Sequence, residues 1–281
     1  MTGSKRLISD VIGFMAGLTS LEINSMLILG PAGMILVGAI AIAYWRRRSS
    51  VGLKYFAIGG VFWAIAIAVK LLMDLTITAP LYASWQAIGP LGALVLLGLY
   101  VGLRTGILEC CVPFLSFRMR SLRSISVDQA TAVGVGFGAT EAIVIAVPSL
   151  MQLITLMANP SILASLPPDQ LQAVEAQLSQ PTYIAAAAIA ERAFTIPIHA
   201  FTTLFSFTAA VSSRWVPLLG AVLFKSALDG PLPLMQAYLG ASGMGILLIE
   251  IFVAVMGLIA LLGIIRQREK RVVTAKETEK D

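Results

Sequence analysis

Residues 26–45 read MLILGPAGMILVGAIAIAYW, and Arg46, Arg47 and Arg48 follow at once. The segment carries no charged side chain, and about 20 consecutive apolar residues are enough for a helix to cross the hydrocarbon core of a bilayer. Because Lys and Arg gather on the cytoplasmic side of membrane helices, the arginines also indicate on which side this helix ends. The segment therefore predicts a membrane span and its direction.

The whole chain shares this character. Of its 281 residues, 58% are hydrophobic and 12% are charged, and the mean hydropathy is +0.87. A soluble domain carries about twice this share of charge, and the alternation of period two that is typical of a transmembrane barrel is absent. The composition predicts an all-α, polytopic transmembrane helical bundle in the cell membrane, with the lipid bilayer as its surroundings. We expect no nucleic-acid partner, although the net charge is +5.

Seven apolar stretches are long enough to span. They lie at about 26–45, 54–74, 86–117, 131–157, 182–212, 216–238 and 242–265. The third stretch is too long for one straight crossing, and it could be broken near Arg104 or at Pro113. If residues 7–22 also crossed, the bundle would have eight spans.

The basic loops predict the orientation. They contain Arg46, Arg47, Arg48 and Lys54 after the first span, Arg118, Arg120 and Arg123 after the third, Arg214 after the fifth, and Arg266, Arg268, Lys270 and Arg271 after the last. With 86–117 as one crossing, all of them fall on one side, which predicts the N-terminus outside and the C-terminus inside. The pair Lys5 and Arg6 opposes this assignment.

Three parts follow from this topology: an N-terminal interfacial segment at 1–25, a transmembrane domain at 26–265 and a cytoplasmic tail at 266–281. The connection 158–181 contains no Lys or Arg and belongs to the outer side. Its Pro167 and Pro168, followed by apolar residues at helical spacing, predict a short amphipathic helix. That helix would either cover the bundle as a lid or pack as an ordinary loop.

Ten ionisable residues remain inside the predicted spans. They are Lys70, Arg104, Glu109, Glu141, Glu191, Arg192, His199, Lys225, Asp229 and Glu250. An unpaired charge in hydrocarbon costs several kcal/mol, so such residues face one another or a wet cavity. The number predicts a polar interior.

The spacing of these residues supports a shared cavity. Glu191 and His199 belong to one polar stripe on the 182–212 helix, two turns apart, and both can face the same space. Gly134 and Gly138 form a small-xxx-small face that permits close helix packing, and Glu141 lies one turn further along. We interpret Glu141, Glu191 and His199 as the mark of a functional cavity.

Simpler structural roles explain the other charges. Lys225 and Asp229 are four residues apart and could neutralise each other on one helix. Lys70 and Arg104 are near enough to the span ends to snorkel to the interface, and Glu250 could pair with an interior Arg or Lys.

Four segments, in order, resemble the YhfC-like family of intramembrane metalloproteases, which are distantly similar to CAAX proteases. GILECC at 106–111 resembles the family's Glu-Glu segment, and GVGFGATEA at 134–142 its Gly-His-Gly-Gly-x-Glu-Ala segment. ERAF at 191–194 with His199 resembles its Glu-Arg…His helix, and KSALD at 225–229 its His-Ala-x-x-Asp segment.

The chain departs from the family at three of these positions. Phe137 and Lys225 stand where the family has histidines, and Cys110 stands where it has the second Glu of Glu-Glu. His199 is the only histidine in the chain, whereas a catalytic zinc usually takes three protein ligands, often including two or three histidines. We hypothesise that Lys225 replaces the charge of the metal and neutralises Glu141 or Glu191.

The resemblance and the polar set leave three functions open. In an active intramembrane metallopeptidase, Glu141 would be the general base, Glu109 a second catalytic carboxylate or ligand, and His199 and Glu191 zinc ligands. A degenerate, metal-free member would instead bind a transmembrane protein partner or lipid through its cavity. A small secondary transporter is the third possibility.

The carboxylates would distinguish these functions. If the protein is an enzyme, we expect His199, Glu141 and another ligand to converge at metal-bond distance. If it is a transporter, we expect a cavity that passes through the bundle. A metal-free scaffold predicts carboxylates paired with Lys225 and Arg192, with Asp229 beside them. The expected cofactor is zinc for the enzyme and none for the scaffold.

Overall fold

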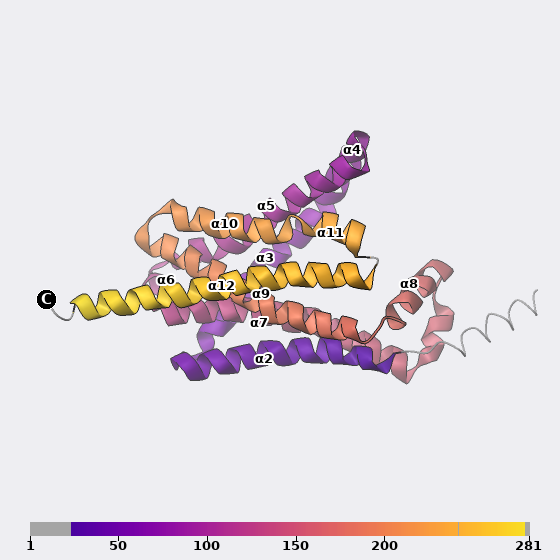
Figure 1. Cartoon of the computed structure of the whole chain (residues 1–281), viewed down its shortest axis with the longest axis horizontal. Coiled ribbons are helices and arrows are strands. Elements are labelled where there is room, and N and C mark those ends of the chain that lie inside the picture. Colours follow the sequence, from indigo (N-terminus) through magenta and orange to yellow (C-terminus); the bar gives the residue numbers. More distant parts are fainter. Residues whose placement is uncertain (1–23, 241, 279–281) are drawn as a thin grey trace, which may run out of the picture.

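Seven helical segments are long and apolar enough to cross a membrane in this computed structural model, which describes residues 24–240 and 242–278 (Figure 1). They are Ser25–Ser49, Leu53–Ile88, Pro90–Phe117, Val127–Ala158, Tyr183–Ser212, Trp215–Leu239 and Gly243–Gln267. These segments confirm the predicted all-α bundle with seven spans. The alternative eighth span at residues 7–22 lies outside the described residues.

Several spans are assembled from more than one helical element. The elements in chain order are η1 (Ser25–Ile28), α2 (Leu29–Ser49), α3 (Leu53–Met73), η2 (Asp74–Thr78), α4 (Ala79–Trp85), η3 (Gln86–Ile88), α5 (Pro90–Phe117), α6 (Arg120–Arg123), α7 (Val127–Ala158), η4 (Pro160–Ser165), α8 (Pro168–Leu178), α9 (Tyr183–Ser212), α10 (Trp215–Asp229), α11 (Leu232–Leu239) and α12 (Gly243–Thr278). The helix expected between residues 158 and 181 is α8, and Pro168 occupies its first turn.

The boundary between the second and third spans differs from the prediction. The chain remains helical past residue 74 through the π-helical turn η2, and it reverses at Gly89. Gly89 has φ 96° and ψ 160°, which only glycine adopts without strain, and Pro90 then begins α5. Residues 86–88 therefore belong to the second segment. The third is one helix without a break at Arg104 or Pro113.

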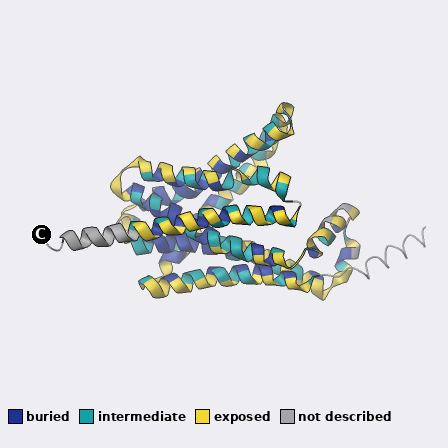
Figure 2. Cartoon of the chain, in the orientation of Figure 1, coloured by how far each residue is buried: buried dark blue, intermediate teal, exposed yellow. Residues whose placement is uncertain are grey.

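Helix α9 is the central element of the bundle. It packs against α2, α5, α7, α10 and α12. Of the residues in its most apolar stretch, 67% are buried, against 17–28% in the corresponding stretches of the other six segments. Buried residues gather along this central region, while the outer faces of the surrounding helices remain exposed (Figure 2). The residues on α9 that face its neighbours therefore define the interior of the protein.

Glycines on α7 let its neighbours approach closely on two sides. A Cβ at Gly134 would lie 2.5 Å from the Cα of Ala200 on α9, and one at Gly138 would lie 2.9 Å from the Cα of Ile196. A Cβ at Gly136 would lie 2.5 Å from the Cα of Phe56 on α3. The small-xxx-small prediction is confirmed for the contact with α9.

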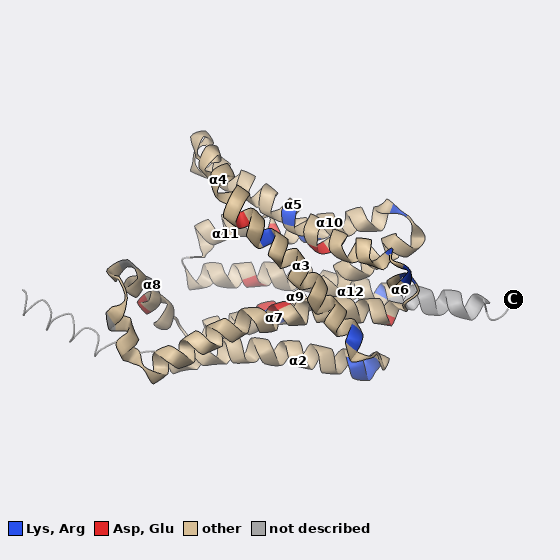
Figure 3. Cartoon of the chain, turned by 180° about the vertical axis from the view of Figure 1, so that it is seen from behind, with Lys and Arg blue, Asp and Glu red and all other residues tan. Residues whose placement is uncertain are grey.

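The two ends of the bundle carry different side chains. Lys and Arg gather at the end where α2 terminates and where α6 lies, toward the C-terminus (Figure 3). Helix α8 lies at the opposite end, where α2 begins (Figure 1). Because basic residues favour the cytoplasmic side, this arrangement fits the predicted orientation, which remains a prediction.

Candidate functional site

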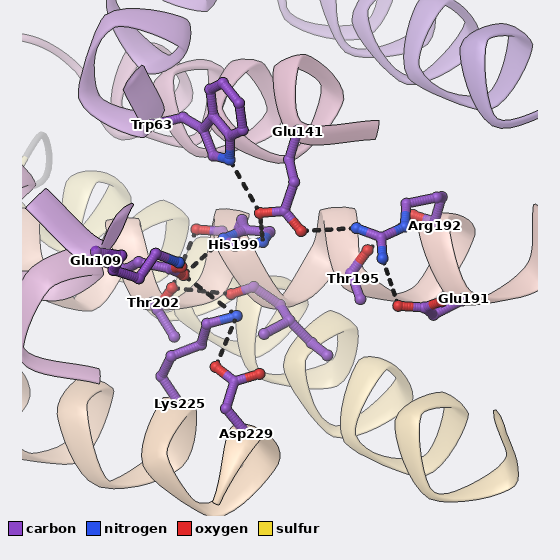
Figure 4. Close-up of polar contacts among 12 residues, drawn as sticks. Trp63, Glu109, Glu141, Glu191, Arg192, Thr195, His199, Thr202, Lys225 and Asp229 are labelled. Carbon is purple, nitrogen blue, oxygen red and sulfur yellow. Dashed lines mark hydrogen bonds and ion pairs between the residues drawn. The ribbon is translucent and has the colours of Figure 1, made fainter. Parts of the chain in front are cut away.

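His199 lies between two carboxylates in the middle of the bundle (Figure 4). Its Nε2 is 3.2 Å from Oε2 of Glu141 on α7, and its Nδ1 is 3.6 Å from Oε2 of Glu109 on α5. The imidazole is 2% exposed. The predicted meeting of His199 with Glu141 is therefore observed, and Glu109 joins it from a third helix.

Glu109 is held by two lysines. Lys70 Nζ, on α3, lies 2.5 Å from its Oε1, and Lys225 Nζ, on α10, lies 3.2 Å from its Oε2. Lys70 thus points inward and does not snorkel, because the buried carboxylate of Glu109 offers it a partner.

Lys225 also pairs with Asp229 on its own helix, at 3.3 Å. This confirms the self-neutralising pair predicted from their spacing. Among the described residues, the direct ion-pair partners of Lys225 are Glu109 and Asp229 and not Glu141 or Glu191, and the hypothesis that Lys225 neutralises Glu141 or Glu191 remains a prediction. The reason for the pairing with Glu109 is geometric: α10 packs directly on α5, which carries Glu109.

Glu141 has a cation of its own. Arg192 Nη1 lies 2.6 Å from its Oε1, and the indole Nε1 of Trp63 donates to its Oε2 at 3.2 Å. Arg192 Nη2 also contacts Glu191 Oε1 at 2.5 Å. Glu191 is therefore linked to the cluster only through Arg192, and its side chain is 34% exposed. In the described part of the chain, no ion pair joins Glu191 to His199.

Two further charges lie outside the cluster around His199. Arg104 pairs with Asp74 in the π-helical turn and also donates to Thr78, so it bridges α5 and the second span instead of snorkelling. π-helical turns often mark functional positions, but here the turn supplies a carboxylate for Arg104. For Glu250 on α12, no ion pair occurs among the described residues.

A stripe of glycines on α5 brings Glu109 to Lys225. A Cβ at Gly102 would lie 2.7 Å from the carbonyl oxygen of Ser226, and one at Gly106 would lie 2.6 Å from that of Val222. Gly98 likewise faces Gly230. The repeat at i, i+4 and i+8 is a sequence signal for a close helix pair, and sequence reasoning passed over it.

Two aromatic residues complete the surroundings of His199. The ring of Phe137 stacks on the imidazole, with centroids 4.7 Å apart and 26° between the planes. Trp63 hydrogen-bonds to the carboxylate beside it. Sequence reasoning did not predict either contact. A single Trp within an apolar stretch gives no signal of its partner.

A cavity of about 440 Å³ opens beside the cluster. It is lined by Trp63, Ile67, Lys70, Val101, Thr105, Glu109, Glu141, Ile145, Lys225, Asp229, Leu232, Pro233 and Gln236. Its volume is within the range of about 300–1,000 Å³ that is typical of ligand pockets. The predicted polar interior is therefore present, with apolar walls around its charges.

The residues of the cluster do not fit the zinc ion that the family resemblance implies. Zinc needs about three protein ligands that point to one place, but Glu109 and Glu141 face opposite nitrogens of the same imidazole. The oxygen of Glu109 that faces His199 is also the one bound by the ammonium of Lys225. Among the residues that the structure describes, no three His, Cys, Asp or Glu side chains are placed to hold a metal ion.

Comparison with known proteins agrees with the resemblance found in the sequence. The model of the YhfC intramembrane metalloprotease family matches residues 33–266, which is more than half of the chain and includes every member of the cluster. No curated protein and no solved structure matches the chain.

Proposed function

Because the chain belongs to the YhfC intramembrane metalloprotease family, we propose that it is a degenerate, metal-free member. It binds a membrane partner or lipid through its polar intramembrane cavity. The observation that carries this proposal is the ammonium of Lys225, 3.2 Å from Glu109 Oε2. A fixed cation there repels a metal ion and neutralises the carboxylate that would bind it.

Phe137, at the other position where the family has a histidine, supports the same proposal. The family resemblance implies histidines at positions 137 and 225. Phe137 stacks on His199, and Lys225 contacts Glu109, so both positions border the site where the resemblance would place a metal. An aromatic ring and an ammonium group thus take the place of two ligands and leave the surrounding helix packing intact.

The pairing of the carboxylates favours a scaffold over an active metal enzyme. Glu109 is paired with Lys225, and Glu141 with Arg192, as the scaffold hypothesis predicts. Paired carboxylates lose the open oxygen atoms that metal coordination requires. They also add rigidity, because breaking a buried pair costs about 3–5 kcal/mol.

The cavity offers a partner both apolar and polar contacts. Ile67, Val101 and Ile145 give it apolar walls, while Thr105 and Gln236 provide uncharged polar groups. Hydrogen bonds between helices in a membrane contribute about 0.6–2 kcal/mol each. A transmembrane segment or lipid with one polar group within the bilayer fits this lining.

Zinc content of the detergent-purified protein tests the metal-free state. We expect well under one zinc per chain in the wild type and in His199→Ala. Restoring both histidines, with Phe137→His and Lys225→His together, is expected to raise the zinc content. Near-stoichiometric zinc in the wild type that is lost in His199→Ala would establish an active metal site and overturn the proposal.

A photo-crosslinking residue at Gln236 tests the partner. We expect a discrete protein or lipid adduct that disappears when Val101→Trp fills the cavity. The same crosslinker at Leu36, which is exposed on α2, is the matched control. Equal adducts at both positions would show ordinary contact with neighbours in the membrane and contradict binding through the cavity.

A further inference from the structure

A second hollow lies on a face of α9 next to the one that carries the polar cluster. It is a groove of about 360 Å³ between α2 and α12, with α7 and α9 as its floor. Its walls include Ile40, Tyr44 and Trp45 of α2 and Leu261 of α12, and its floor includes Thr131 of α7 and Ala193 of α9. None of these residues lines the polar cavity.

The interior of this groove offers almost entirely apolar contacts. The hydroxyl of Thr131 donates to the carbonyl oxygen of Val127 at 2.8 Å, and the indole Nε1 of Trp45 donates to that of Asp128 at 3.1 Å. Their polar atoms are therefore already engaged. Ile40 and Tyr44 on the groove wall are 55% and 62% exposed, so the groove is open toward the surrounding membrane.

The groove continues into a basic hollow at the end of α2. Ile40 and Tyr44 line both spaces, and the second is completed by Ala43, Arg47 and Arg48. Both arginines are exposed. Among the side chains that the structure describes, neither forms an ion pair with a carboxylate. The apolar groove thus adjoins two guanidinium groups. They belong to the end of α2, where Lys and Arg gather (Figure 3).

We propose that this groove binds one anionic glycerophospholipid. An acyl chain lies between α2 and α12 on the floor formed by α7 and α9, and the phosphate contacts Arg47 and Arg48. Guanidinium groups bind phosphate oxygens in pairs, and basic pockets between membrane helices bind anionic headgroups. The site goes beyond the proposed function, because it uses a different face of α9 and none of the cavity residues.

The chemistry of the groove discriminates among lipids. A zwitterionic phosphatidylcholine would bring its own cation to the two arginines and lose the net attraction. A headgroup without acyl chains would lose the apolar contacts, which for a lipid are worth more with each buried methylene. The groove therefore requires both an acyl chain and a net negative headgroup.

Native mass spectrometry of the full-length protein in detergent tests this site, with dioleoyl-phosphatidylglycerol and dioleoyl-phosphatidylcholine as probes. We expect the wild type to retain one phosphatidylglycerol in preference to phosphatidylcholine. Arg47→Ser with Arg48→Ser is expected to weaken phosphatidylglycerol binding about 30-fold, because each basic residue contributes about one kcal/mol at a membrane surface. Glycerol 3-phosphate alone is expected not to bind at the same concentrations.

Two matched controls distinguish binding at this groove from general electrostatic attraction of anionic lipid to the basic end of the protein. Arg120→Ser with Arg123→Ser removes the same charge from the same end, away from the groove, and is expected to leave binding unchanged. Ala193→Phe fills the groove and is expected to abolish retention of both lipids, whereas Ala64→Phe, on the exposed face of α3, is not.

Three results would overturn the proposal: no preference for phosphatidylglycerol, an equal loss in the Arg120 and Arg123 variant, or full retention in Ala193→Phe. The arginine variant alone remains decisive if Ala193→Phe fails to fold, because Arg47 and Arg48 are exposed and support no packing.

Discussion

Phe137 stacks on the imidazole of His199, with ring centroids 4.7 Å apart. The phenyl ring is 1% exposed and fills the space beside the only histidine in the chain. A phenyl ring carries no charge and donates no hydrogen bond, so Phe137 contributes through packing. Its stacking fixes the plane of the imidazole between Glu109 and Glu141.

Removing this ring is expected to destabilise the bundle. Phe137→Ala should lower the free energy of unfolding by about 3–5 kcal/mol, the usual cost of deleting a buried phenyl ring. Unfolding in mixed micelles with increasing SDS measures this change. Leu115→Ala, at a position 62% exposed on α5, is the control and should change stability little. A loss no larger than that of the control would refute the packing role of Phe137.

Lys225 is expected to matter for stability. Lys225→Met leaves the carboxylates of Glu109 and Asp229 without their shared cation, which should cost about 3–5 kcal/mol. Glu109 keeps Lys70 in this variant, so Asp229 is the carboxylate left without a cation. Adding Asp229→Asn removes that charge and should restore part of the loss. The same SDS titration measures both variants, with Lys54→Met, an exposed lysine on α3, as the control. A fully additive double variant would show that the two residues are not coupled.

The close packing of α5 on α10 predicts a sharp difference between two glycines. In Gly102→Ala the new Cβ would lie 2.7 Å from the carbonyl oxygen of Ser226, so the helices must separate, at a cost of about 1–3 kcal/mol. In Gly220→Ala the nearest atom is Cδ1 of Phe205 at 3.9 Å, and no loss is expected. Thermal melting in detergent compares them. Equal melting temperatures would contradict close packing at Gly102.

The predicted orientation, with the N-terminus outside and the C-terminus inside the cell, can be tested by cysteine labelling. In a background with Cys110→Ala and Cys111→Ala, Ser161→Cys in η4 should react with a membrane-impermeant maleimide on intact cells. Ser124→Cys, beside the basic residues of α6, should react only after the cells are opened. The reverse pattern would place the C-terminus outside, against the distribution of Lys and Arg.

The sequence was sufficient to predict the seven spans, because hydropathy depends on the composition of each segment. The reversal at Gly89 was missed, since the apolar stretch continues across it. Only the Gly89-Pro90 pair could have marked the turn. Even so, one displaced boundary did not alter the number of spans.

The sequence also predicted that the intramembrane charges would meet, because a lone charge in hydrocarbon is costly. It could not predict their partners. The choice depends on helix rotation and on close approach, and the glycines of α5 bring Glu109 to Lys225 although these residues are more than one hundred positions apart. The sequence predicted Lys70 at the membrane interface, because nothing near Lys70 in the sequence indicates that Glu109 of α5 is its partner.

The ion pairs have a consequence for how the protein enters the membrane during synthesis. Lys70 with Glu109, and Arg104 with Asp74, join the second and third spans; Arg192 with Glu141 joins the fourth and fifth. Lys225 and Asp229 lie on one helix. Each of these carboxylates thus finds a cation on its own helix or on the adjacent span in the chain. Successive hairpins can therefore leave the translocation machinery with these ion pairs already formed, before the complete bundle exists.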